Sequence, residues 1–170
     1  VLFYDLIKQV LFESPLIICV SLVLGGIVLL VIDRFAPAPR HEDPTQLPWA
    51  TSFGVGFFQV ISMIPGVSRS GATIVGSMLL GVEKRAAAEF SFFLAIPTMA
   101  AAFTKDAWES RDLIDLDHAW IIGIGFVVSM VTAIVVIKAM LAIVTARGYA
   151  PFGWWRIVVG GIGLAVIGLA

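Results

Sequence analysis

The sequence has little charge and almost no cysteine. Of its 170 residues, 14% are charged and 59% are hydrophobic, whereas about 25% of the residues in an ordinary soluble domain are charged. The hydrophobic residues lie in runs of membrane-spanning length, so the composition predicts an integral membrane protein. A net charge of −1 argues against a nucleic-acid partner, which would require a basic face.

Cys19 is the single cysteine, so the chain has no disulfide framework, and its apolar neighbours are typical of a small buried residue. His41 has no second ligand-type residue at the spacing of a metal site. His118, beside Asp117, is expected to cap the start of a span. Val1 is preceded by no methionine or basic leader region, so we expect a piece of a longer protein.

Apolar runs and polar breaks divide one predicted transmembrane domain, 1–170, into four spans and a hairpin. The spans are expected at 15–34, 86–104, 118–145 and 152–170. Residues 49–80 form two short apolar stretches broken at Pro65 and Gly66, and neither stretch reaches the roughly 20 residues needed to cross. This pattern predicts a re-entrant helix-loop-helix hairpin with its tip at membrane depth; a single kinked span of about 30 residues is the alternative.

Lysine and arginine predict the orientation of the spans. Threading the chain places most of the basic residues on one side: Arg34, Arg40, Lys84, Arg85, Arg147 and Arg156. Fewer fall on the other side: Lys8, Lys105 and Arg111. The first side is therefore expected to be cytoplasmic, with Arg156 as an interfacial anchor, and the hairpin enters from that side.

The stretch from Pro65 to Thr73 is the candidate functional site. Arg69 stands there among hydroxyls and glycines, and an arginine at membrane depth without a function would cost about 3 kcal/mol or more. Ser70 is expected to cap the second hairpin helix, with Thr73 in its first turn. Free N–H groups and the helix dipole make such a turn attractive to anions.

The neighbouring groups suit a phosphate. The guanidinium of Arg69 matches phosphate oxygens bidentately, and the Ser68, Ser70 and Thr73 hydroxyls can bond the remaining ones. Gly66 and Gly71 let the backbone approach a ligand closely. The alternative is a structural arginine paired with carbonyls, with the serines acting as caps.

Two further polar residues are candidates for supporting roles. Gln59 is a polar side chain in the first short stretch of the hairpin, upstream of the loop. Glu89 is expected either to pair with Arg69 and orient the site or to pair with Arg85 four residues earlier on the same helix.

The motif Pro-Gly-x-Ser-Arg-Ser-Gly-Ala-Thr resembles the second signature of the undecaprenyl-diphosphate phosphatase family, also called the bacitracin-resistance protein family. Surrounding segments are similar too: 56–59, 81–82, 87–92 and 95–97. The resemblance runs over essentially the whole chain. It implies an all-helical membrane fold with two re-entrant hairpins in an inverted repeat, of which this chain supplies the second.

The same resemblance implies hydrolysis of undecaprenyl diphosphate to the monophosphate, which recycles the lipid carrier of peptidoglycan synthesis and confers bacitracin resistance. Arg69, Ser68 and Ser70 would be catalytic, and Thr73, Gly71 and Gly66 would bind phosphate. The family's Glu-x-x-x-Glu helix and Ser-Ser-Thr-Gly-His loop are absent here, so this chain alone is expected to be inactive.

The implied setting is a bacterial inner membrane, with the site open to the periplasm. The expected partners are the polyprenyl diphosphate, membrane lipid and the missing N-terminal half, and a homodimer is left open. That half would hold the ligands of a divalent cation, Mg²⁺ or Ca²⁺, with no metal ligand in this chain. A polyprenyl-phosphate or anion transporter, or a flippase, is the alternative function, because broken helices also bind anions in transporters.

Overall fold

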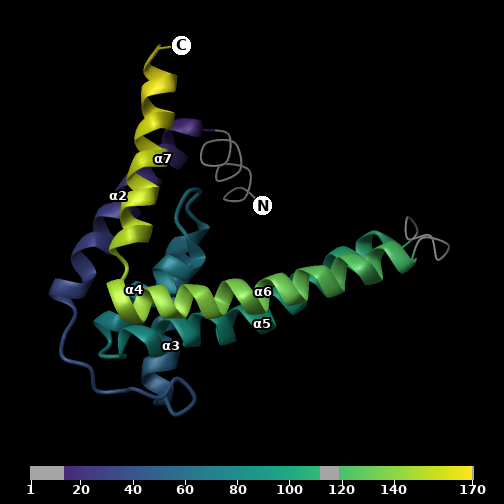
Figure 1. Ribbon diagram of the computed structural model, residues 1–170, viewed down its shortest axis with the longest axis horizontal. Coiled ribbons are helices and arrows are strands. Elements are labelled where there is room, and N and C mark those ends of the chain that lie inside the picture. Colours follow the sequence, from purple (N-terminus) through teal and green to yellow (C-terminus); the bar gives the residue numbers. More distant parts are fainter. Residues whose placement is uncertain (1–13, 112–118, 170) are drawn as a thin grey trace, which may run out of the picture.

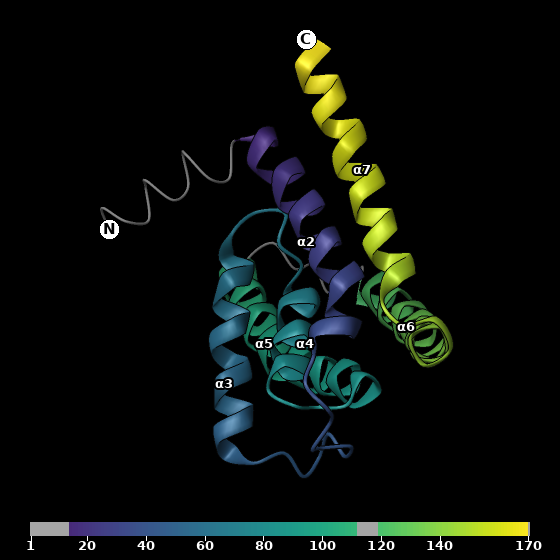
Figure 2. The ribbon, with the colours of Figure 1, turned by 90° about the vertical axis from the view of Figure 1, so that its left-hand side faces the viewer.

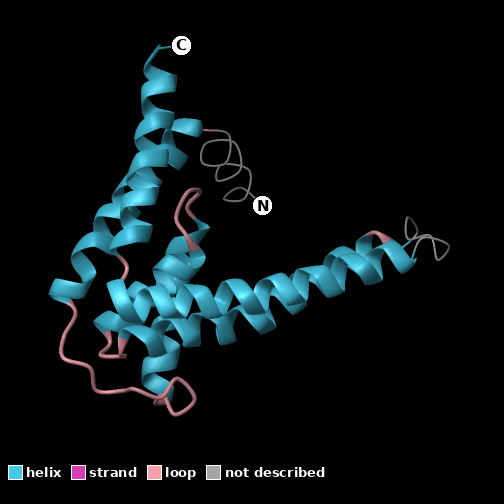
Figure 3. Cartoon of the chain, in the orientation of Figure 1, coloured by secondary structure: helices cyan, strands magenta, loops and turns pink. Residues whose placement is uncertain are grey.

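A computed structural model describes residues 14–111 and 119–169, and every regular element in these ranges is helical (Figures 1 and 3). The α-helices are α2 (Pro15–Phe35), α3 (Trp49–Val60), α4 (Arg69–Leu79), α5 (Lys84–Glu109), α6 (Ala119–Arg147) and α7 (Ala150–Leu169), and a 3₁₀ turn, η2 (Ile61–Met63), follows α3. The all-α fold expected from the sequence is confirmed. His118 and Asp117 lie outside the described residues.

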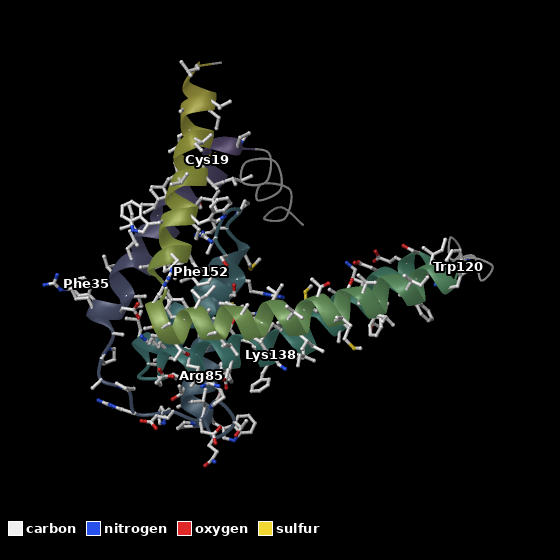
Figure 4. The ribbon with its side chains drawn as sticks, in the orientation of Figure 1. Cys19, Phe35, Arg85, Trp120, Lys138 and Phe152 are labelled. Atoms are coloured by element: carbon white, nitrogen blue, oxygen red, sulfur yellow. The ribbon has the colours of Figure 1, made fainter. Side chains whose placement is uncertain are left out.

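Four of these helices, α2, α5, α6 and α7, are long and apolar enough to cross a membrane. Large apolar side chains point outward along them; Phe35 is 70% exposed and Trp120 is 64% exposed (Figure 4). Apolar surface of this extent is unfavourable in water and is the expected surface of a protein that contacts lipid. The chain is therefore an integral membrane protein.

Helices α2 and α7 lie side by side and run in opposite directions (Figures 1 and 2). Glycines allow their backbones to touch: a Cβ on Gly26 would lie 2.7 Å from the carbonyl oxygen of Gly153, and one on Gly160 would lie 2.8 Å from that of Cys19. Small residues at such contacts are the usual means of close helix packing in membranes. Gly26 and Gly160 therefore serve the close packing of α2 and α7.

The residues 49–80 fold as a hairpin of α3 and α4, which pack against each other and run in opposite directions (Figure 2). Gly76 accommodates the Phe58 ring at this contact, because a Cβ there would collide with it. The hairpin tip, residues 64–68, is a short loop rather than continuous helix. This break brings the N-terminus of α4 to one end of the hairpin.

The core lies where α4 meets α2, α5 and the turn between α6 and α7. Its buried members include Ile74, Ala87, Val144 and Tyr149. The Tyr149 hydroxyl donates to the carbonyl oxygen of Lys84 at 2.6 Å. Burial raises the pKa of Tyr149, and nearby carboxylates add to the shift. This core fixes α4 and α5, which carry the candidate site.

Candidate functional site

The loop before α4 is shaped by Gly66, whose φ of +87° favours glycine. A Cβ at this position would lie 2.5 Å from the carbonyl oxygen of Ile18 on α2. Gly66 is therefore required both by its backbone angle and by the close approach of α2. Gly66 forms the turn two residues before Ser68, where α4 begins.

Helix α4 is capped by Ser68, not by Ser70 as the sequence suggested. The Ser68 hydroxyl oxygen accepts a hydrogen bond from the Gly71 amide at 3.1 Å, which is the usual geometry between an N-cap and the third helical residue. Ser70 lies inside the first turn, is exposed, and its hydroxyl is 3.1 Å from that of Ser68. Both hydroxyls thus lie at the positive end of the α4 dipole.

Arg69, the first residue of α4, is half-buried and is held by a hydroxyl on α5. Its Nη1 donates to Thr98 Oγ1 at 3.0 Å. Among residues 14–111 and 119–169, no carboxylate forms an ion pair with Arg69. The guanidinium charge is therefore not neutralised by this part of the chain, which is the arrangement that an anion site requires.

Thr73 lies one turn deeper and is only 2% exposed. Its hydroxyl bonds the carbonyl oxygens of Arg69 and Ser70 and lies 2.7 Å from the Ser91 hydroxyl on α5. Those bonds tie the first turn of α4 to α5. Thr73 therefore supports the first turn of α4, and the phosphate contact expected of it stays a prediction.

Glu89 pairs with Arg85 at 2.9 Å across one turn of α5, which confirms the second of the two alternatives for this residue. Gln59 is half-buried near the end of α3, and its backbone carbonyl oxygen accepts a bond from the Ser62 hydroxyl. In the described part of the chain, neither side chain forms a hydrogen bond or ion pair with Arg69. The structure therefore brings together Ser68, Arg69 and Ser70, with Gly66 and Gly71 shaping their backbone.

Three residues contact the 66–73 segment although the sequence did not predict these contacts: Ser91, Thr98 and Arg156. Ser91 and Thr98 lie two helical turns apart and so share one face of α5. This spacing is the sequence feature that could have indicated that both face the same neighbour. Arg156 was expected to be an interfacial anchor. Instead it is half-buried, and its Nη2 donates to the carbonyl oxygen of Gly66 at 2.8 Å.

A cavity of about 330 Å³ adjoins the capped end of α4. Its wall is mainly apolar and comes from α2, α3, η2 and α4, including Leu24, Phe58 and Val75. Ser68 and Arg156 also line it. A cavity with an apolar wall and a few polar groups is typical of a site for an amphipathic ligand.

A divalent cation does not fit the side chains of this site. Mg²⁺ and Ca²⁺ prefer carboxylate and carbonyl oxygens, whereas the side chains here are hydroxyls and guanidinium groups. Within the described ranges, no group of three histidine, cysteine, aspartate or glutamate side chains is close enough to hold a metal ion. No chemical step is therefore assigned to a metal held by these residues.

The fold and the site together define an integral membrane protein with a cationic, hydroxyl-lined helix terminus at the tip of a hairpin. The sequence model described as "Bacitracin resistance protein BacA" matches residues 1–162. The chain belongs to this family.

Curated relatives agree with this membership. An undecaprenyl-diphosphatase of Chelativorans sp. is 56% identical over 161 residues, which cover 95% of this chain and 60% of the relative. One of Cereibacter sphaeroides is 53% identical over 167 residues, covering 98% and 62%. Undecaprenyl-diphosphatase 1 of Agrobacterium fabrum is 49% identical over 164 residues, covering 96% and 61%. The chain thus spans about three fifths of the length of these relatives.

Proposed function

We propose that the complete protein hydrolyses undecaprenyl diphosphate to undecaprenyl phosphate, and that this chain supplies the phosphate-binding loop. The observation that carries the proposal is Arg69: a half-buried guanidinium at the N-terminus of α4, held by Thr98 and not paired with a carboxylate in the described residues. The printed names of the relatives and the intact 65–73 motif support the choice of reaction.

In this reaction the bond between the bridging oxygen and the terminal phosphorus breaks. Water ultimately supplies the new oxygen on that phosphorus, and the bridging oxygen stays with the lipid monophosphate. Arg69 would contact the non-bridging oxygens and stabilise the negative charge that concentrates on them. Ser68 and Ser70 would donate to the same phosphate, aided by the free amide groups and dipole of the first turn of α4.

The remaining parts of the site are proposed to lie outside this chain. The family resemblance assigns carboxylates, a serine nucleophile candidate and a histidine to an N-terminal half, which would hold Mg²⁺ or Ca²⁺. The family resemblance implies a bacterial inner membrane with the site open to the periplasm, and the lysine and arginine distribution favours the matching orientation. Polyprenyl lipid and the N-terminal half would be its partners, with a homodimer as an alternative assembly.

Transport or flipping of an anionic lipid is the second candidate. The short helices α3 and α4 favour it, because neither is long enough to span a bilayer and such hairpins form the anion sites of transporters. Phosphate release from undecaprenyl diphosphate by the complete protein in detergent separates the two. Release by the wild type supports the enzyme; no release from any prenyl diphosphate refutes it and favours transport.

A further inference from the structure

Arg156 contacts the candidate loop although it stands 90 residues further along the chain, on α7. Helix α2 lies between α7 and the hairpin (Figure 2). The guanidinium therefore passes beside α2 to reach the carbonyl oxygen of Gly66, at 2.8 Å. This bond links the last helix of the chain to the loop that carries Ser68 and Arg69.

Gly25 on α2 provides the space for this contact. A Cβ at Gly25 would lie 2.7 Å from Arg156 Nη2 and 3.3 Å from its Cζ, so any larger residue would displace the guanidinium. The neighbouring Gly26 has a different task, since it contacts the Gly153 backbone. The glycine pair therefore combines close helix packing with a passage for the Arg156 side chain.

Gly66 is consequently held from two helices. The Ile18 backbone of α2 abuts its Cα, and Arg156 of α7 bonds its carbonyl oxygen. Ser68, the N-cap of α4, follows two residues later, and Arg69 comes next. Because the loop is short, a shift of the Gly66 peptide would move the cap and the guanidinium of Arg69 with it.

The contact between Arg156 and Gly66 leaves a buried polar atom without a partner in the described part of the chain, and helix packing alone does not require that cost. Arg156 Nε is buried and has no hydrogen-bond partner among the described residues. No carboxylate in those residues forms an ion pair with Arg156. A buried polar group without a partner is unfavourable, and an apolar side chain would avoid that cost. Such a cost is more often found at functional sites than in purely structural contacts.

We propose that Arg156 is a positioning residue, which fixes the Pro65–Gly66 turn through the Gly66 carbonyl and so places Arg69 and Ser68 on the substrate phosphate. The inference rests on the proposed function. It assigns no contact between Arg156 and the reacting atoms. It also gives Gly25 a role in the site, because Gly25 admits the guanidinium.

The test compares Arg156→Met, Arg156→Lys and Gly25→Ala in the complete protein, with Gly161→Ala as control, because a Cβ at Gly161 meets open space. Phosphate release from undecaprenyl diphosphate gives kcat and KM. We expect kcat to fall at least about 10-fold in Arg156→Met and Gly25→Ala, the factor for a hydrogen bond from a charged donor. Arg156→Lys keeps a cationic donor and should recover part of the loss.

Gly25→Ala keeps the arginine, so it tests the contact even if Arg156→Met does not fold. Wild-type kcat in Gly25→Ala would overturn the proposal, as would a loss confined to KM or to the thermal midpoint. A second test adds Arg156→Met to Arg69→Ala. If Arg156 acts through the loop, this addition should cause much less loss than it does alone, whereas multiplicative losses would contradict the mechanism.

Calorimetric binding of inorganic pyrophosphate supplies a readout that does not need hydrolysis. The same variants should weaken it about 10-fold, and unchanged binding would count against the role of Arg156. If the wild type binds pyrophosphate but releases no phosphate, the proposed hydrolysis is refuted. The role of Arg156 is then tested by comparing pyrophosphate binding of the variants with that of the wild type. A wild type that neither binds nor releases refutes the phosphate site, and the inference falls with it.

Discussion

The hydrogen bond from Arg69 to Thr98 offers a sharp perturbation of the site, because it can be removed without touching either the arginine or the loop. Thr98→Val replaces the hydroxyl with a methyl group of similar size. The bond is 3.0 Å long, and Thr98 Oγ1 also donates to the backbone of its own helix, with the Leu94 and Ala95 carbonyl oxygens 3.1 and 3.0 Å away. In the variant, Arg69 loses its fixed partner and can adopt more rotamers.

A hydrogen bond to a charged group contributes about 1.5–3 kcal/mol. Arg69 is half-buried, so water can replace part of the lost bond, and we take the lower end of that range. This value corresponds to a loss of about 10-fold in kcat/KM for phosphate release by the complete protein. The guanidinium stays present, so some activity should remain.

Thr98→Ser is the matched control, because it keeps the hydroxyl and removes only a methyl group. It should retain activity within about 3-fold of the wild type, and both variants should keep similar thermal midpoints. If Thr98→Val were as active as Thr98→Ser, Thr98 would have no part in orienting Arg69. If both variants lost activity equally, packing rather than the hydroxyl would be responsible.

Two further predictions concern the cap and the core. Ser68→Ala removes the acceptor of the Gly71 amide and should lower the free energy of unfolding by about 1 kcal/mol. Ser70 makes no capping bond, so Ser70→Ala should lower activity more than stability. Equal midpoints in thermal denaturation of the two variants would contradict this. The pKa of Tyr149 is raised above 10.0 in the folded protein by burial and by the Asp33 and Glu83 carboxylates, so Tyr149 contributes stability fully below pH 10 and loses it at higher pH, when the unfolded chain ionises first. Tyr149→Phe should remove that part of the alkaline decline in the thermal midpoint, and an unchanged slope above pH 10 would refute the assignment.

Much of the fold follows from local sequence. Two short apolar stretches broken at Pro65 and Gly66 predicted a hairpin rather than a span, and α3 and α4 form it. Long apolar runs predicted the helices that could cross a membrane, and four such helices are present. These features depend on the length and composition of consecutive residues, which the sequence displays directly.

The choice of cap could not be made from local sequence. Ser68 and Ser70 are both good N-cap residues, and each is followed by plausible helical residues. In the structure Ser68 is the cap, two residues after Gly66, which packs against Ile18 on α2. This contact depends on the packing of distant segments.

Arg156 illustrates the same limit more strongly. At the start of an apolar run and beside two tryptophans, it has the pattern of an interfacial anchor. Its contact with Gly66 depends on Gly25, which opens a passage beside α2 and belongs to a different helix. Glu89, by contrast, pairs with Arg85 on its own helix, a contact that i,i+4 spacing makes available without tertiary structure.

The most direct test of the central claim measures phosphate release from undecaprenyl diphosphate by the complete protein and by Arg69→Ala. Removing one charged donor from a phosphoryl-transfer site should lower kcat by about 10²–10³-fold. Arg85→Ala, which removes an exposed arginine paired with Glu89, is the control and should stay close to the wild type. Undiminished release by Arg69→Ala would contradict the account, because the loop would then not hold the phosphate that is cleaved.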